Sequence, residues 1–191
     1  SRGYGKKFLK ADNGEGRAKV LLDIERIYNA VAANPLWDQN RIAVMGGSYG
    51  GFMALHSMVN LNNFVRCGID VVGISNFVTF LENTSDYRRD LRRVEYGNER
   101  LPEMRKFLQE LSPLTHVEKI TRPLLIVQGA NDPRVPASES AQIEAALRKK
   151  DIETWYLLAK DEGHGFRKQT NRTFQFLTTV QFLRRHLLGV D

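Results

Sequence analysis

The chain has 191 residues, of which 42% are hydrophobic and 26% are charged, which is typical of one globular domain that can bury a core. No apolar run approaches the roughly 18 residues of a membrane-spanning helix, and the N-terminus lacks a secretory signal pattern, so no membrane partner is expected. The single cysteine, Cys67, cannot form an internal disulfide, so we expect a cytoplasmic location, with an exported protein whose signal has been removed as the alternative.

The net charge of +6 and the basic pI raise the question of a nucleic-acid partner. The densest basic cluster, formed by four arginines between Arg88 and Arg93, is interrupted by acidic residues. It also lacks the interleaved aromatic residues of a base-stacking surface. We therefore expect an ion-paired protein surface and no nucleic-acid partner.

Helix and strand patterns alternate along the first part of the chain. From Arg17 to Ala33 apolar residues recur every three or four positions, which predicts an amphipathic helix that ends before Pro35. Arg41 to Met45 is a short apolar run bounded by polar residues and glycines, which is typical of a buried strand. A second helix is predicted over Phe52 to Leu61.

The same alternation continues to the C-terminus. It predicts strands over Val65 to Ile74, Leu124 to Val127 and Thr154 to Leu158, and helices over Ser138 to Lys149 and Asn171 to Leu188. The last helix is expected to turn Phe174, Leu177, Val180 and Leu183 toward the core.

This order of elements predicts an α/β fold, a mostly parallel sheet with helices on both faces. Residues 83–115 interrupt the order with charged, weakly periodic sequence that is longer than a simple crossover requires. We expect them to form a helical, cap-like insertion in a single domain that spans residues 1–191.

The strand that ends at Met45 runs into Gly46-Gly47-Ser48-Tyr49-Gly50-Gly51 and then directly into a helix. This is the context of a nucleophile elbow, a sharp turn that exposes a serine hydroxyl. Glycines two positions before and after Ser48 are expected because the turn strains the serine backbone and brings neighbouring chain too close for a Cβ. We predict Ser48 as a nucleophile, with a simple glycine-rich turn as the alternative.

A serine hydroxyl needs a base, and the chain has four histidines. His164 is the predicted base, because two flanking glycines in the loop after the last strand allow its ring to reach across the sheet edge. His56 lies within a helix, where a packed or hydrogen-bonded role is expected. His186 lies near a helix C-terminus, which favours a surface role, and His116 lies in a loop without an evident orienting group.

Asp132 is the predicted acid that orients the histidine. It follows the strand at Leu124 to Val127, and open α/β sheets build their sites at the carboxyl ends of strands. The order serine, aspartate, histidine also matches this kind of fold. An aspartate that favours a turn before Pro133 is the alternative role, and Asp70 and then Asp161 are the competing acids.

Together these segments resemble the C-terminal hydrolase domain of the prolyl oligopeptidase family, which includes acylaminoacyl peptidases and dipeptidyl peptidases. The resemblance implies an α/β-hydrolase fold and a serine peptidase that cleaves short peptides through an acyl-enzyme intermediate, without a metal or cofactor. The matching segments are Gly3-Tyr4-Gly5, Gly46 to Gly51, Ser112-Pro113, Asn131 to Pro136 and Gly163-His164-Gly165-Phe166.

The resemblance also implies roles around the catalytic residues. The backbone N–H of Tyr49 would donate a hydrogen bond to the oxyanion, and Arg134 would hold a carbonyl of the peptide substrate. Tyr49, Val72, Phe77 and Tyr87 are candidates for the wall of the first specificity pocket, with core packing as the alternative for Val72 and Phe77.

Parts of the family pattern are not found in this sequence. The family's second oxyanion donor is a tyrosine that would precede Ser1, and only the C-terminal half of the family's sheet is recognised. Its N-terminal β-propeller is not recognised either. We therefore expect a partial domain that needs the missing N-terminal segment or an oligomeric partner and has low activity by itself.

Two other functions remain open at this stage. An esterase of the dienelactone-hydrolase kind would use the same fold and triad, although Arg134 favours a peptide substrate. A catalytically silent interaction module would instead bind a partner through its surface. The sequence does not distinguish endopeptidase from exopeptidase activity.

Overall fold

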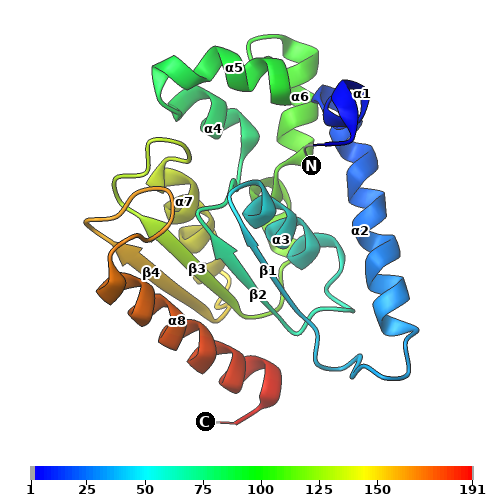
Figure 1. Cartoon of the computed structure of the whole chain (residues 1–191), viewed down its shortest axis with the longest axis vertical. Helices are drawn as coiled ribbons and strands as arrows, with labels where there is room; N and C mark the ends of the chain where they lie inside the picture. The colour runs from blue at the N-terminus through cyan, green and yellow to red at the C-terminus, as the bar shows by residue number, and fades with distance from the viewer. Residues whose placement is uncertain (1–2, 191) are drawn as a thin grey trace.

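The computed structural model describes residues 3–190; Ser1, Arg2 and Asp191, which the predicted domain includes, lie outside the described residues. Within this range four parallel strands form one sheet in the order β1-β2-β3-β4 (Figure 1). Their bounds are Ala43–Gly47 for β1, Cys67–Val71 for β2, Leu124–Gly129 for β3 and Thr154–Ala159 for β4. The parallel sheet and its four strands confirm the predicted architecture.

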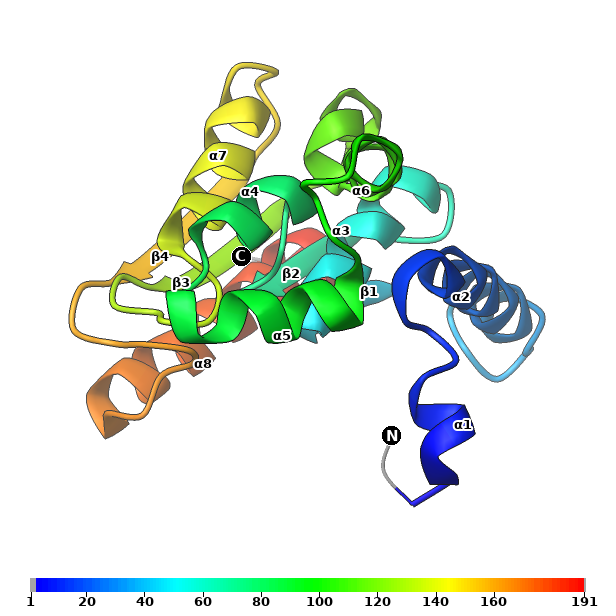
Figure 2. The ribbon, with the colours of Figure 1, turned by 90° about the horizontal axis from the view of Figure 1, so that it is seen from above.

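Helices cover both faces of this sheet. Figure 2 shows α3 and α7 on one face and α8 on the other, with α2 beside α3. The α-helices are α1 Gly5–Leu9, α2 Arg17–Ala32, α3 Tyr49–Asn60, α4 Phe77–Asn83, α5 Asp86–Tyr96, α6 Pro102–Leu111, α7 Ala137–Arg148 and α8 Gln169–Leu183. Two 3-10 helices, Gly14–Gly16 and Pro113–Lys119, precede α2 and β3, and a π-helical turn, Arg184–Leu188, continues α8.

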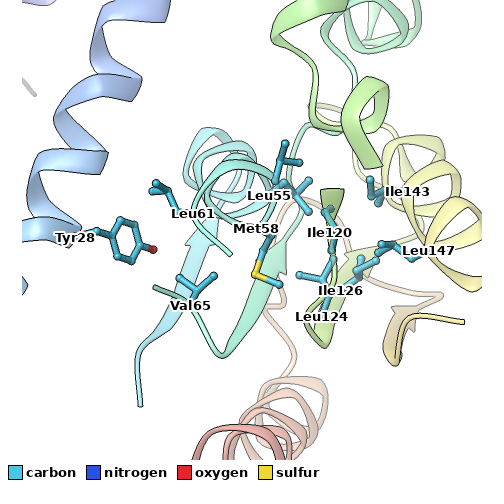
Figure 3. Close-up of a cluster of buried hydrophobic side chains, with 11 residues drawn as sticks. Tyr28, Leu55, Met58, Leu61, Val65, Ile120, Leu124, Ile126, Ile143 and Leu147 are labelled. Atoms are coloured by element: carbon cyan, nitrogen blue, oxygen red, sulfur yellow. The ribbon is translucent and has the colours of Figure 1, made fainter. Parts of the chain in front are cut away.

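The β3 strand shows why both faces need helices. Leu124 and Ile126 are fully buried in the cluster between the sheet and helices α3 and α7, part of which Figure 3 shows. Leu125 and Val127 point to the opposite face and pack with Phe182 of α8. Because side chains alternate along a strand, an apolar run of this kind is buried only when both faces are covered.

The exposed face of α8 differs from its prediction. Phe174 is 60% exposed, Leu177 is 57% exposed and Val180 is also exposed, so the expectation that they face the core is wrong. Of the predicted set only Leu183 packs against the core, next to the fully buried Phe182. Helical periodicity shows which residues share a face, but it does not show which face a sheet will cover.

The predicted cap region contains α5 and α6, with α4, which was not predicted as a helix, just before it. Three of the four clustered arginines are ion-paired, as expected: Arg89 with Asp86, Arg92 with Glu95, and Arg93 with Asp90 and Glu99. Arg88 instead contacts the ring of Tyr87. The Arg93–Glu99 pair is not on the surface, since both side chains are almost completely buried. No helix between residues 3 and 190 combines the length and apolar character needed to cross a bilayer.

Candidate active site

The predicted catalytic residues lie on loops at one edge of the sheet. Because the strands are parallel, their carboxyl ends meet at the same edge, where the loops into α3, α7 and α8 lie (Figure 1). Ser48 follows β1, Asp132 follows β3 and His164 follows β4. This is the edge at which open α/β sheets bind their ligands.

Ser48 has the strained backbone of a nucleophile elbow. Its φ of 58° and ψ of −117° lie in a region that L-residues rarely adopt, and its N–H donates to the carbonyl oxygen of Val71 at 2.8 Å. A Cβ at Gly46 would overlap the carbonyl of Gly50, so glycine is needed at position 46.

The expected steric need for glycine two residues after Ser48 is not met. A Cβ at Gly50 has no neighbour within 4 Å, whereas a Cβ at Gly51 would overlap the Asp70 carboxylate and Gly73. The crowded position is therefore Gly51, one residue further along, where the start of α3 passes close to the end of β2.

Tyr49 is the first residue of α3, so its backbone N–H has no acceptor within the helix and lies at the positive end of the helix dipole. The Arg17 guanidinium makes a cation–π contact with the Tyr49 ring, 4.6 Å from its centroid, and lies 4.4 Å from the centroid of the Tyr96 ring. Burial raises the pKa of the Tyr49 hydroxyl, and the Arg17 charge opposes this shift. Arg17 was not predicted, because a basic residue in the first turn of a helix is usually solvated.

The structure brings Asp132 and His164 together. Asp132 Oδ2 lies 2.7 Å from His164 Nδ1, and Asp132 Oδ1 accepts backbone N–H groups from Arg134 at 2.8 Å and Val135 at 3.1 Å. The Asp132 side chain is completely buried, whereas the His164 side chain is slightly exposed. The carboxylate therefore orients the imidazole so that Nε2 is left to exchange protons with a substrate or nucleophile.

The loop that carries His164 is fixed by Glu162. The Glu162 carboxylate accepts the backbone N–H groups of Arg167 and Lys168, each at 2.9 Å, and the side-chain amide of Asn171 at 2.8 Å. These hydrogen bonds, first of all that from Arg167, lower the pKa of Glu162. The Glu162 carbonyl accepts the N–H of Asn131 at 2.9 Å, which draws the loop after the edge strand β4 across the end of β3.

Ser48 and His164 line two cavities that share Arg134. Ser48 lines a cavity of about 170 Å³ and His164 a second cavity of about 460 Å³, and Arg134 lines both. Within residues 3–190 Ser48 Oγ makes no hydrogen bond to the His164 ring. Catalytic hydrogen bonds often form only when substrate is bound; the structure thus joins the predicted acid and base and places the nucleophile beside the neighbouring cavity.

The Ser48 cavity has mixed walls, in which charged residues alternate with apolar and aromatic ones. Three of its residues, Ser48, Tyr49 and Arg134, were predicted from the sequence. The others were missed because no local pattern places their side chains at the site, although Val135 lies within the Asn131 to Pro136 motif; they are Ile74, Phe80, Arg92, Glu95, Tyr96 and Val135.

Three predicted wall residues do not line the Ser48 cavity. Val72 is buried at the end of β2 and Phe77 is buried in the core. Tyr87 is 70% exposed, and its ring contacts the guanidinium of Arg88, 5.7 Å from the ring centroid.

The competing acids have other environments. Asp70 is completely buried beside Gly51 and Gly73; no side chain within residues 3–190 hydrogen-bonds to its carboxylate, and only the backbone of Gly73 partly favours its charge. Burial raises the pKa of Asp70 to about 7. Asp161 pairs with Lys168 at 2.5 Å. Neither residue contacts His164 in the described part of the chain.

The competing histidines also lie apart from Asp132. His56 packs against Phe52, and its burial lowers the pKa to about 4, as a packed helical histidine requires. His116 contacts the carbonyl oxygen of Glu110 through Nε2 at 2.8 Å. The expected surface role for His186 is wrong, because its ring is largely buried and lies 4.7 Å from that of Phe182.

Comparison with known proteins shows related sequences over nearly the whole chain. The profile of the prolyl oligopeptidase family matches residues 1–189. The chain is 39% identical to dipeptidyl peptidase family member 6 of Caenorhabditis elegans and covers 26% of that protein, with 99% of this chain aligned. It is 40% identical to dipeptidyl aminopeptidase BIII of Pseudoxanthomonas mexicana, with 93% of this chain and 26% of that protein aligned.

Solved structures share the same fold. A puromycin-hydrolyzing peptidase of Mycobacterium tuberculosis has a TM-score of 0.81 and 29% identity, over 90% of this chain and 25% of that chain. A puromycin hydrolase has a TM-score of 0.89 and 24% identity, over 100% of this chain and 28% of that chain. The chain thus spans about a quarter of the length of these proteins.

Proposed function

The chain belongs to the prolyl oligopeptidase family and has its α/β-hydrolase fold, and on that basis we propose that it is the catalytic part of a serine peptidase that cleaves short peptides. The observation that carries the proposal is the 2.7 Å contact between Asp132 and His164, on the loops next to the strained elbow of Ser48. The three residues form the proposed catalytic triad.

The triad performs acyl transfer in two steps. Ser48 Oγ attacks the carbonyl carbon while His164 Nε2 takes its proton, and the Tyr49 N–H donates to the oxyanion that forms. The C–N bond then breaks, and the leaving amine takes the proton from His164. In the second step His164 removes a proton from water, which attacks the acyl group, and Ser48 leaves with the proton restored to its oxygen.

Asp132 stabilises the imidazolium that exists between these proton transfers. Its Oδ2 contacts Nδ1 of the ring, and its other oxygen is saturated by two backbone N–H groups. The carboxylate therefore cannot turn away from the histidine without losing hydrogen bonds. The ring stays in the tautomer that presents a bare Nε2 to Ser48.

The Ser48 cavity receives the acyl side of the substrate. The apolar part of its wall, Ile74, Phe80 and Val135, suits an apolar side chain, and the ion pair of Arg92 with Glu95 lies at the same cavity. Arg134 lies between this cavity and His164, where its planar guanidinium can hold a substrate carbonyl next to the scissile bond.

Full activity requires further polypeptide, supplied by an N-terminal segment or by an oligomeric partner. Strand β1 is an edge of the described sheet, and Met45 on this strand is exposed. Leu22 and Ile27 of α2 and Phe174 of α8 are also exposed. Apolar surface of this extent on a sheet edge and its flanking helices is normally covered.

The location is cytoplasmic in this proposal. The only cysteine, Cys67, is a free and fully buried thiol in β2, and burial raises its pKa to about 11. A buried, protonated thiol is unreactive, and a chain without disulfides is compatible with a reducing compartment.

Labelling with a fluorophosphonate tests the proposed nucleophile, because only an activated serine reacts. We expect labelling of the purified protein and of Tyr28→Phe, a matched hydroxyl deletion away from the site, and no labelling of Ser48→Ala. Labelling that persists in Ser48→Ala would contradict the assignment. Absence of labelling in a longer protein that also supplies the N-terminal segment would favour an interaction module.

The choice between peptidase and esterase depends on Arg134. In Arg134→Ala we expect the rate of peptide cleavage to fall at least 10-fold more than that of a simple acyl ester, because the ester has no preceding peptide carbonyl to hold. An equal loss for both substrates would favour an esterase.

A further inference from the structure

The cavity beside His164 is rich in charged side chains. It is lined by Pro133, Arg134, Asp161, Glu162, Gly163, His164, Gly165, Arg167 and Lys168. Three basic and two acidic residues therefore line the cavity around the predicted base. The Ser48 cavity shares only Arg134 with it, so the other charges belong to the His164 side alone.

Both carboxylates of this cavity already have partners within the protein. Asp161 pairs with the ammonium group of Lys168 at 2.5 Å, and Glu162 accepts the backbone N–H groups of Arg167 and Lys168. The guanidinium groups of Arg134 and Arg167 have no ion pair and no side-chain hydrogen bond with any residue between 3 and 190. Two unpaired cations thus remain at the surface of a cavity that contains the catalytic base.

The position of His164 defines which part of a substrate enters this cavity. Asp132 holds Nδ1, so Nε2 must give its proton to the leaving amine. The leaving fragment therefore departs on the His164 side, and the acyl fragment occupies the Ser48 side. A negatively charged substrate group that binds the unpaired guanidiniums of the His164 cavity must therefore be part of the leaving fragment.

Arg167 is better placed than Arg134 to bind the leaving fragment. Arg134 lines both cavities and is already assigned to a carbonyl near the scissile bond. Arg167 lines only the His164 cavity, and its backbone is fixed by the hydrogen bond to Glu162 at 2.9 Å. A fixed backbone lowers the entropic cost of ordering the side chain on a ligand.

Building on the proposed peptidase function, we propose that Arg167 binds the carboxylate of the leaving fragment. The enzyme then prefers short peptides whose leaving portion ends in a free carboxylate close to the scissile bond. A guanidinium binds a carboxylate through two parallel hydrogen bonds. Because Arg167 is exposed, we expect a preference of about 5-fold, which weakens as salt is added.

The test uses two peptides with the same acyl portion, one with a free C-terminal carboxylate on its leaving residue and one with a C-terminal amide. The ratio of their kcat/KM values is measured for the native protein, for Arg167→Gln and for Arg172→Gln. Arg172 is an exposed arginine of α8 that does not line the cavity, so this control removes the same charge nearby. We expect the native protein and Arg172→Gln to favour the free acid about 5-fold, and Arg167→Gln to cleave both peptides equally, chiefly through a change in KM.

Other outcomes overturn the inference. Equal cleavage of the two peptides by the native protein would do so, and so would an unchanged ratio in Arg167→Gln. An equal loss for both peptides in Arg167→Gln would mean that Arg167 supports the loop instead of reading the substrate. If the native protein cleaves neither peptide and no other, the proposed peptidase function fails together with the inference.

Discussion

Replacement of Asp70 by asparagine should stabilise the protein, increasingly so as the pH rises from 4 to 7. The Asp70 carboxylate is completely buried and has no side-chain hydrogen-bond partner within residues 3–190; only the backbone of Gly73 partly offsets the effect of burial. Its burial, and to a smaller extent the negative charge of Glu139, raises the pKa from 3.8 to about 7. Ionisation of Asp70 is therefore much less favourable in the folded protein than in the unfolded chain.

The sign and size of the effect follow from these two pKa values. Above about pH 4 the unfolded chain loses the Asp70 proton while the folded protein keeps it, so the free energy of unfolding falls as the pH rises. The loss is complete above pH 7, where a pKa of about 7 against 3.8 corresponds to about 4 kcal/mol. Asparagine has nearly the same shape and does not ionise, so the free energy of unfolding of Asp70→Asn should not fall in this way as the pH rises.

Urea unfolding at several pH values between 4 and 8, followed by the fluorescence of the two tryptophans, measures the difference. We expect the free energy of unfolding of Asp70→Asn relative to the native protein to increase by about 4 kcal/mol over this range. Glu139, whose pKa burial also raises, is present in both proteins and largely cancels.

Asp161→Asn is the matched control. The exposed carboxylate of Asp161 has a lowered pKa, chiefly because of the hydrogen bond from Lys168. Its ionisation therefore stabilises the folded protein at pH values above the pKa in the unfolded chain. Asp161→Asn should thus not become more stabilising as the pH rises. A difference between Asp70→Asn and the native protein that stays constant from pH 4 to pH 8 would refute the reasoning, since Asp70 would then ionise as easily in the folded protein as in the unfolded chain.

Three further substitutions test the active site and the core. Glu162→Gln should lower kcat at least 10-fold with little change in KM, because the His164 loop loses an acceptor for its backbone N–H groups. Asp161→Asn should have a much smaller effect. Steady-state kinetics measures the change in kcat, and the NMR signal of the proton between His164 and Asp132 shows whether their contact is kept. Asp132→Asn should lower kcat about 10⁴-fold by imposing the wrong tautomer on the imidazole, without changing the urea midpoint. Phe182→Ala should cost about 3–5 kcal/mol in urea unfolding, because Phe182 is fully buried between α8 and the sheet.

Each of these expectations has a contradicting result. Equal kinetic effects of Glu162→Gln and Asp161→Asn would mean that charge, not loop geometry, is responsible. A small loss of kcat in Asp132→Asn would exclude Asp132 as the acid. A loss of stability below about 1 kcal/mol in Phe182→Ala would mean that the site collapses around the smaller side chain.

Local patterns in the sequence determined the elements and the identity of the candidate site. Apolar runs of four to six residues and helical periodicity predicted the four strands and most of the helices, with ends that shift by a few residues, as at β1. The elbow around Ser48 was predictable because a sharp, strained turn requires small neighbouring residues, and Gly46 is such a residue. Asp132 and His164 were predictable because they follow successive strands whose carboxyl ends must meet.

Only the tertiary structure decided how distant segments meet. The packing of Phe182 of α8 on the sheet, the contact of Arg17 with Tyr49, and the hydrogen bond from the Asn131 N–H to the Glu162 carbonyl, which holds the His164 loop near Asp132, all join residues that no local pattern relates. Such contacts depend on where whole elements dock and on which buried polar groups find partners there. Periodicity within one segment records a shared face, whereas the neighbour that covers this face is chosen by the folding of the complete chain.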